Sequence, residues 1–199
     1  MGDKFIDALT SRWTWIIENN EDLKNWMRRW NFLIELDPKY KLSLTSEKVR
    51  EALVFAAFNK TSMKEVLEEN LPHWLESVLD KEVIRILSKE VPAQFQAATG
   101  HYHKIHYTES EPPYVEVRLQ EMFGVTQNPK LGFGKLPLTF KLLAPNYRPT
   151  QVTSDIANFW KTTYFEVRKE LRSRYPKHSW PDDPLSDPPV AKGTRRRPQ

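Results

Sequence analysis

Apolar residues recur every three or four positions through the first ninety residues of the chain. Such spacing places large side chains on one face of an amphipathic helix. We predict five helices, with a sixth that either continues the fifth or stands alone. Their apolar positions are, in order, Phe5, Leu9, Trp13, Ile16 and Ile17; Leu23, Trp26, Met27, Trp30, Leu33 and Ile34; Val49, Leu53 and Ala56; a short segment after Ser62; Trp74, Leu75, Val78 and Leu79; and Val83, Ile84 and Leu87.

Residues that favour helix ends mark where these helices begin and stop. Ser62 and Glu65 form a capping-box pattern, in which each side chain bonds the other's backbone N–H. Pro72 suits the first turn of a helix, where its missing N–H is not needed. Pro38 ends the second helix and Ser46 opens the third. The connections are short, which favours helices that pack antiparallel as neighbours.

The helical spacing gives way near Val91 to shorter segments separated by Gly and Pro. Glycine can adopt the positive φ that hairpin turns need, and Gly100 lies between two such segments. We expect strands over residues 95–98, 101–107 and 136–143, with a short extended piece over 151–153.

Residues 115–123 have two interpretations. Their apolar positions fit a helix that ends at Gly124, since glycine is the common residue just past a helix end. A strand over residues 114–119 is the alternative.

The segment after residue 151 predicts one long helix. Its apolar stripe consists of Ile156, Trp160, Tyr164, Val167, Leu171 and Tyr175. Thr153 or Ser154 can cap its start. Pro176 stops it, because a proline ring removes a donor and clashes with the preceding turn. The opposite face is basic, so the helix offers an apolar face to a core and a basic face to an acidic partner.

Together these segments predict an α+β protein. A helical subdomain over residues 1–90 precedes an α+β domain over residues 91–184, in which a small sheet is closed by the long amphipathic helix. Residues 185–199 are rich in Pro and Arg, and we expect them to form a disordered basic tail.

Composition narrows the class of protein. The chain contains no cysteine, which excludes a disulfide framework and a thiolate zinc site and is compatible with a reducing cytoplasm. Neither a secretory signal pattern nor an apolar run of about 18 residues is present. We therefore expect a soluble, cytoplasmic protein with no membrane partner.

The charge is divided unevenly along the chain. Residues 91–199 carry 16 Lys and Arg against 10 Asp and Glu, whereas residues 1–90 carry 14 against 16. A basic half is compatible with a module that binds a polyanion, although many domains without such a ligand are equally basic.

Basic and aromatic residues alternate along the predicted long helix and just beyond it. Cations neutralise phosphates and aromatic rings stack on bases, each stack contributing roughly 1–3 kcal/mol. We predict contacts to RNA or single-stranded nucleic acid at Arg148, Lys161, Phe165, Arg168, Lys169, Arg172, Arg174, Lys177, His178 and Trp180. Two alternatives use the same residues. Either the aromatic rings pack and the cations pair with neighbouring acids, or the face docks on another domain.

No catalytic motif is apparent. The stretch GFGK at residues 132–135 lacks the spacing of a phosphate-binding P-loop, and no Asp-Glu-x-His segment is present to hold magnesium. His101, His103 and His106 form a histidine cluster, but a strand would place the third on the face opposite the first two. We therefore predict no catalytic residue, metal or cofactor in this chain.

Residues 148–181 carry a pattern that resembles a known family. The motifs are Arg148-Pro149, Gln151-Val152-Thr153, Asp155, Phe159-Trp160, Val167-Arg168-Lys169-Glu170, the run RYPKH and Trp180-Pro181. They are similar to the C-terminal signature of the HrpB family, bacterial ATP-dependent RNA helicases of the DEAH/RHA type. The upstream stretches VRLQEMFGV and LPLTFKLLAP resemble the same family in the same order.

The resemblance implies an accessory C-terminal region of a helicase. Its helical half would follow the helicase core, and its second half would contain a small, barrel-like sheet. The motor domains would be a partner and would bind ATP and Mg²⁺, so ATP turnover is not expected from this chain alone. The region would contribute a nucleic-acid contact and coupling to the motor. The alternative is a docking module without direct nucleic-acid binding.

Overall fold

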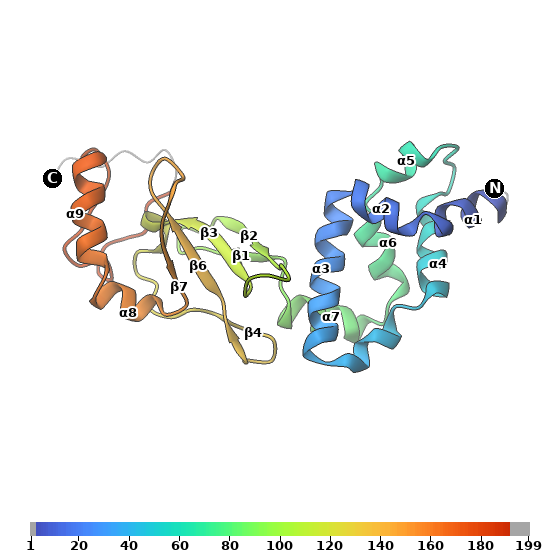
Figure 1. Cartoon of the computed structure of the whole chain (residues 1–199), viewed down its shortest axis with the longest axis horizontal. Helices are drawn as coiled ribbons and strands as arrows, with labels where there is room; N and C mark the ends of the chain where they lie inside the picture. The colour runs from blue at the N-terminus through green and yellow to red at the C-terminus, as the bar shows by residue number, and fades with distance from the viewer. Residues whose placement is uncertain (1–2, 192–199) are drawn as a thin grey trace. The chain divides into compact units, whose positions relative to one another are not determined.

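The structure is a computed structural model, and it describes residues 3–191. The chain forms two compact units, one up to Pro92 and one from Ala93 (Figure 1). Each unit has a core of its own. Within the described range, no helix is both long and apolar enough to cross a bilayer.

The first unit consists of helices. They are α1 (Asp3–Ser11), α2 (Trp13–Asn19), α3 (Glu21–Leu36), the 3-10 helix η1 (Pro38–Ser43), α4 (Ser46–Ala56), α5 (Met63–Leu67), α6 (Leu71–Val78) and α7 (Lys81–Glu90). The single first helix predicted from the sequence is wrong, because the chain breaks at Arg12 between α1 and α2. The hydroxyls of Thr10 and Ser11 donate to the carbonyls of Ile6 and Ala8 at 2.8 and 2.9 Å. Such bonds to preceding carbonyls favour bends in helices.

Side-chain caps fix the helix starts. The predicted capping box is confirmed, since Ser62 Oγ accepts the Glu65 N–H at 3.3 Å and Glu65 Oε2 accepts the Ser62 N–H at 3.2 Å. Asn20, Thr45, Asn70 and Asp80 cap α3, α4, α6 and α7 more simply, each side chain accepting one backbone N–H of the first turn. Each cap satisfies a backbone donor that the helix itself leaves unpaired.

The apolar stripes of these helices form the core of the first unit. Trp26 and Trp30 of α3 are buried, and their rings stack with centroids 5.3 Å apart. Trp15 falls off the stripe in the sequence and is exposed. The periodicity therefore identified which faces are buried.

The second unit is built on an open mixed sheet. Its elements are β1 (Gln94–Gln96), β2 (Tyr102–His106), β3 (Tyr114–Arg118), the 3-10 helix η2 (Leu119–Met122), β4 (Lys130–Leu131), β5 (Leu136–Pro137), β6 (Thr139–Leu143), β7 (Pro149–Thr153), α8 (Ile156–Lys161) and α9 (Tyr164–Arg174). The strand order is β1-β2-β3-β6-β7, with β3 and β6 parallel and β4 and β5 in a separate hairpin. A closed barrel needs bonds between its first and last strands. Here β1 and β7 are edges, so the expected barrel-like sheet is wrong.

Strand β3 lies where the sequence was ambiguous. Val115 and Val117 are buried and pair with Phe140 and Leu142 of β6. The helix predicted over residues 115–123 is therefore wrong and the strand alternative is right. Alternating β-branched side chains suit a pleated surface that is buried on one face.

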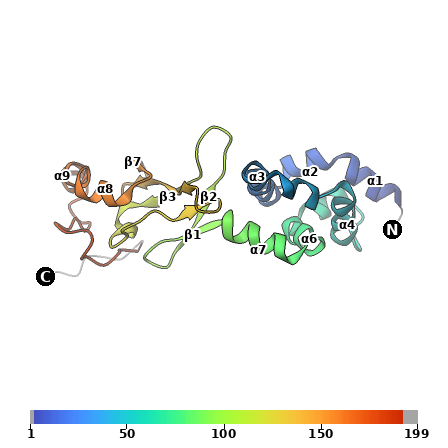
Figure 2. The same ribbon diagram turned by 90° about the horizontal axis from the view of Figure 1, so that it is seen from below.

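The predicted long helix is also wrong, because it is interrupted between α8 and α9 (Figures 1 and 2). Thr162 has φ −118° and ψ −73°, and its hydroxyl donates to the carbonyl of Asn158 at 2.8 Å. Adjacent threonines are stiff, and their hydroxyls compete with the backbone for carbonyls, which favours a break. Phe159, Trp160 and Tyr164 remain buried on both sides of it.

The segment after α9 returns to the sheet. Gly124 N–H donates to Pro184 O, and Val190 N–H donates to Gln120 O, each at 2.9 Å. Arg118 Nη2 adds a bond to Val190 O at 3.3 Å. Part of the segment expected to be disordered, residues 185–191, is therefore hydrogen-bonded here. The remainder, residues 192–199, lies outside the described residues.

Candidate nucleic-acid interface

One face of α9 carries a basic groove. The groove has a volume of about 580 Å³ and is lined by Phe165, Arg168, Lys169, Arg172, Ser173 and Pro176. Its lining contains three cations and one aromatic ring but no carboxylate. The Phe165 side chain is 50% exposed, so a large apolar surface faces solvent among positive charges. We call these residues the α9 groove.

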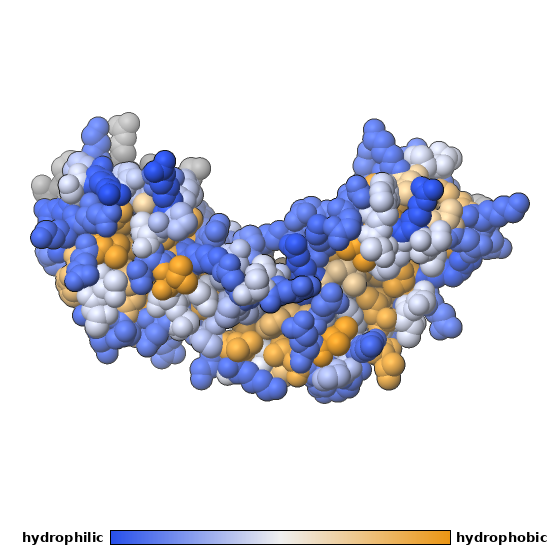
Figure 3. Space-filling view, in the orientation of Figure 1, coloured by the Kyte–Doolittle hydropathy of each residue, from blue (hydrophilic) through white to orange (hydrophobic). Residues whose placement is uncertain are grey.

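The helix forms where the sequence predicted a basic face. Lys169 and Arg172 lie three positions apart, which puts them on one side of the helix, and both are exposed. Among residues 3–191, no ion pair involves either side chain. Hydrophilic residues cover much of the second unit around α9 on the side seen in Figure 3.

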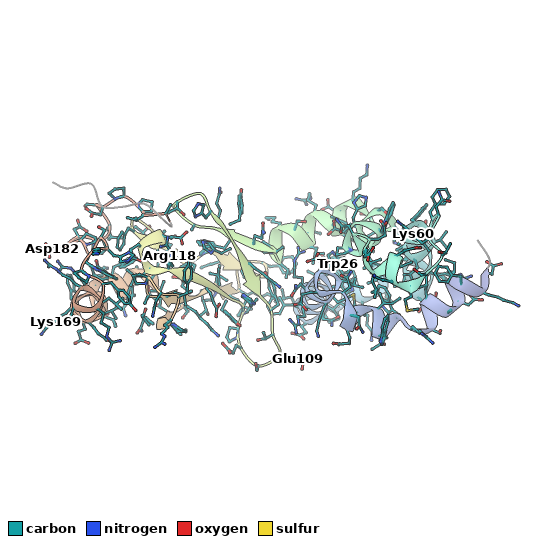
Figure 4. All side chains as sticks on the ribbon, turned by 90° about the horizontal axis from the view of Figure 1, so that it is seen from above. Trp26, Lys60, Glu109, Arg118, Lys169 and Asp182 are labelled. Carbon is teal, nitrogen blue, oxygen red and sulfur yellow. The ribbon has the colours of Figure 1, made fainter. Side chains whose placement is uncertain are left out.

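Arg168 lies in the groove but is held by its own neighbours. Its side chain is only 16% exposed and forms an ion pair with Asp182. Its Nε donates to the carbonyl of Trp180 at 2.9 Å. Figure 4 views α9 nearly end-on, with Lys169 and Asp182 on different sides of the helix. Arg168 therefore adds positive potential to the groove while it fastens the following segment to α9.

Trp180 packs and does not offer a ring face to solvent. It is 6% exposed, and its Nε1 donates to the carbonyl of Tyr175 at 2.8 Å. The hydroxyl of Tyr164 donates to the next carbonyl along, Pro181 O, at 2.8 Å. Burial raises the pKa of Tyr164, as expected for a phenol used as a donor in the interior. The packing alternative therefore describes Trp180 in this structure, and Phe165 is the exposed ring of this face.

The other predicted residues do not line the groove. Arg174 pairs with Glu170 one turn earlier at 3.1 Å, whereas Lys161 ends α8 and Lys177 follows α9, both exposed. Burial, together with the charge of Arg118, lowers the pKa of His178. Arg148 lies apart from α9 in chain order, in the turn that joins β6 and β7.

A buried ionic network escaped the sequence analysis. Glu121 is 4% exposed, and its Oε1 accepts from Arg118 Nε at 3.0 Å. Its Oε2 accepts from the Thr99 hydroxyl at 3.1 Å and contacts His101 Nδ1 and His103 Nε2 at 3.3 and 3.2 Å. Burial raises the pKa of Glu121, but Arg118 and His103 outweigh it and hold the pKa below the ordinary value. Arg118 and Glu121 are three residues apart, and the only signal was this spacing.

The histidine cluster is divided as strand geometry predicted. His101 and His103 contact Glu121, whereas the ring of His106 stacks on Tyr114 with centroids 4.9 Å apart. Within residues 3–191, no group of three or more metal-ligating side chains converges as a metal ion would require.

Comparison with known proteins identifies the family. The family model HrpB_C, described as the C-terminal region of ATP-dependent helicases, matches residues 53–184. The chain belongs to this family. The resemblance read from residues 148–181 is therefore confirmed, and the match extends into the helices of the first unit.

Relatives of HrpB type share both sequence and fold with this chain. The ATP-dependent RNA helicase HrpB of Escherichia coli strain K12 is 46% identical over 116 residues, which is 58% of this chain and 14% of that protein. A crystal structure of E. coli DExH-box NTPase HrpB superposes with a TM-score of 0.71 and 34% identity, over 86% of this chain and 22% of that one. A second crystal structure, of the Escherichia coli DEAH/RHA helicase HrpB, superposes with a TM-score of 0.59 and 33% identity. The match covers 80% of this chain and 21% of that one.

The chain therefore spans about a fifth or less of the relatives that it matches. It is homologous to the accessory C-terminal part of a helicase, and its sequence lacks the P-loop with which an NTPase holds phosphates.

Proposed function

We propose that this chain is the accessory region of an ATP-dependent RNA helicase and contacts single-stranded nucleic acid through the α9 groove. The observation that carries the proposal is the lining of that groove. Three cations surround a half-exposed phenylalanine, no carboxylate is among the lining residues, and within residues 3–191 only Arg168 of the three is paired with an acid.

Each side chain has a distinct role in this proposal. Lys169 and Arg172 are exposed, so they can approach phosphates and displace the counterions around them. Phe165 supplies a face on which an unpaired base can stack, whatever its identity. Arg168 contributes positive charge to the groove but is fixed by Asp182 and by the Trp180 carbonyl. Its main role in this proposal is to hold the segment after α9 in place, not to bind a phosphate.

The motor of such a helicase lies in the part that this chain does not span. ATP and Mg²⁺ would be bound there, and RNA is the substrate class in the name of the E. coli relative. The role of the present region is then to hold the strand beside the motor and to couple its movement to ATP use.

Docking on the motor domains through the same basic face is the second candidate. It is favoured by the small share of its relatives that the chain spans, because most of a related helicase is available as a partner.

Fluorescence anisotropy with a short single-stranded RNA across a salt series tests the proposal. We expect the affinity of the chain to fall steeply as salt rises, because bound phosphates release counterions. The variant Lys169→Glu/Arg172→Glu should bind more weakly and lower the slope of log affinity against log salt by about 1.4, roughly 0.7 for each phosphate that is no longer neutralised.

A matched control is Lys130→Glu/Lys135→Glu, which makes the same charge change on the hairpin of β4 and β5 in the same unit. We expect it to bind within about twofold of the parent, allowing for the long-range part of the charge change. If the parent chain binds no RNA at low salt, the nucleic-acid proposal is wrong and docking is favoured. Equal losses in both variants would show binding without a defined site.

A further inference from the structure

The α9 groove contains one cation that a carboxylate of the same chain already holds. Arg168 is among the lining residues, and its Nη2 forms an ion pair with Asp182. Asp182 is not one of the lining residues, so it contacts the guanidinium from outside the groove. One guanidinium is therefore available to two anions, the carboxylate of its own chain and a phosphate that enters the groove.

A second bond fixes the position of this guanidinium. Arg168 Nε donates to the carbonyl of Trp180 at 2.9 Å, and the Trp180 ring is buried. The next carbonyl, that of Pro181, accepts from the Tyr164 hydroxyl at 2.8 Å. These bonds hold Arg168 and the segment after α9 in place when the carboxylate leaves. Little side-chain order is then lost when Arg168 binds a phosphate, because the side chain is already ordered.

The ion pair between Arg168 and Asp182 can be exchanged at low cost. The Asp182 side chain is 92% exposed, whereas that of Arg168 is 16% exposed. Within residues 3–191, Asp182 forms no other hydrogen bond or ion pair, so its carboxylate can return to water and leave no buried group unsatisfied. An ion pair whose carboxylate is solvated contributes at most about fivefold to an equilibrium constant. A guanidinium also binds the oxygens of a phosphate in the same geometry as those of a carboxylate.

We propose that Asp182 limits the affinity of the α9 groove for a single strand by competing with one of the strand's phosphates for Arg168. This inference rests on the proposed function and adds a third cation to the two that contact phosphates there. Arg168 has two partners in succession, Asp182 until a strand binds and a phosphate afterwards. A region that holds a moving strand must also release it, and the return of the carboxylate favours release.

Fluorescence anisotropy with a short single-stranded RNA tests this competition in a double-mutant cycle. Asp182→Asn removes the charge and keeps the size of the side chain. It should raise affinity about threefold, within the range that such an ion pair contributes. Arg168→Gln should lower the slope of log affinity against log salt by about 0.7, as for one phosphate that is no longer neutralised. In the Arg168→Gln background, Asp182→Asn should leave affinity unchanged, because the competition needs both residues.

Asp187→Asn is the matched control, because it makes the same change in the same segment after α9. Asp187 does not line the groove, and no ion pair involves it in the part of the chain that the structure describes. It should change affinity by less than about 1.5-fold, the long-range part of the charge change. Asp182→Glu keeps the carboxylate and should bind like the parent. Circular dichroism establishes that each variant is folded, and the two Asp182 variants test the inference even if Arg168→Gln is not.

The outcomes separate this inference from the proposed function. If Lys169→Glu/Arg172→Glu weakens binding but Asp182→Asn does not strengthen it, the inference is overturned and the proposed function stands. A gain from Asp182→Asn that persists in the Arg168→Gln background, or that Asp187→Asn reproduces, overturns competition for Arg168 in favour of a general effect of charge. If the parent binds no RNA, both proposals fail.

Discussion

At the scale of single residues, several charged and aromatic side chains of the second unit are buried or bonded within that unit and stabilise its fold. Trp180 was expected among the surface contacts, yet its ring is buried and its N–H is bonded to a carbonyl. The guanidinium of Arg168 binds the same segment. The proposed nucleic-acid contact therefore rests on the exposed members, Phe165, Lys169 and Arg172.

Trp180→Ala should destabilise the second unit by about 3–5 kcal/mol, the usual cost of truncating a buried tryptophan. Trp180→Phe should cost less, because it keeps most of the apolar area and loses mainly the bond to the Tyr175 carbonyl. Urea unfolding followed by circular dichroism measures both. A loss below about 1 kcal/mol for Trp180→Ala would show that the ring lies outside the core, and Trp180 would again be a candidate for contact with nucleic acid.

Glu121→Gln should destabilise the second unit by about 3–5 kcal/mol, because it leaves the buried Arg118 without its counter-charge. The measurement is the free energy of unfolding at neutral pH. Arg174→Gln is the control, since Arg174 pairs with Glu170 on an exposed helix surface of the same unit, where an ion pair contributes at most about 1 kcal/mol.

The pH dependence of stability reports the same carboxyl. Its pKa is lower in the folded state than in the unfolded chain, so the unfolded chain binds more protons as pH falls. The contribution of Glu121 is thus fully present above its unfolded pKa, near 4.5, and is lost as pH falls through the lower folded value. Urea titrations from neutral pH to about pH 3 should show this decline in the parent and a flatter profile in Glu121→Gln.

At the scale of elements, local signals and tertiary contacts share control of where helices begin. Helix α8 starts with two bonds of different origin. Asp155 Oδ1 accepts the Asn158 N–H at 3.0 Å, as a local cap does. Asn128, far away in the chain, accepts the Ile156 N–H at 2.7 Å and donates to the Leu138 carbonyl at 2.7 Å.

Asn128→Ala should therefore cost more than Asp155→Ala. The local cap contributes about 1 kcal/mol. Removing Asn128 leaves the Ile156 N–H and the Leu138 carbonyl without this partner, and each buried group left unsatisfied costs about 1–3 kcal/mol. Urea unfolding of the two variants and of the double variant measures the difference. Equal losses would show that Asn128 does not tie α8 to the sheet.

At the scale of the whole molecule, the chain has two separate cores. Leu33 of α3 and Leu142 of β6 are fully buried, one in each unit. Units with their own cores can unfold as separate cooperative steps.

Leu33→Ala should lower the stability of the first unit by about 2–5 kcal/mol and leave the second unit nearly unchanged, and Leu142→Ala should do the reverse. Hydrogen exchange read by mass spectrometry measures the protection of each segment in both variants. If each variant reduced protection to the same degree on both sides of Pro92, the two units would be one cooperative body.

The sequence by itself determined the class of fold, the helices of the first unit apart from the break at Arg12, and the family. Spacing of three and four positions is set by the geometry of a helix alone, so Trp26 and Trp30 could be placed on a buried face without coordinates. The Ser62 and Glu65 cap is equally local. The basic face of α9 followed from the same spacing, and the motifs between Arg148 and Pro181 identified the HrpB family.

Only the tertiary structure decided the features that depend on distant partners. Residues 114–118 are a strand because β6 pairs beside them, although their spacing also fits a helix. The Arg118 and Glu121 network gathers residues from β2, η2 and the C-terminal segment. Trp180 is buried because Arg168 bonds its carbonyl and Tyr164 bonds the next one, that of Pro181, which fastens this segment to α9. Local propensity fixes φ and ψ over a few residues, whereas burial, register and the pairing of charges depend on what the rest of the chain brings to the same place.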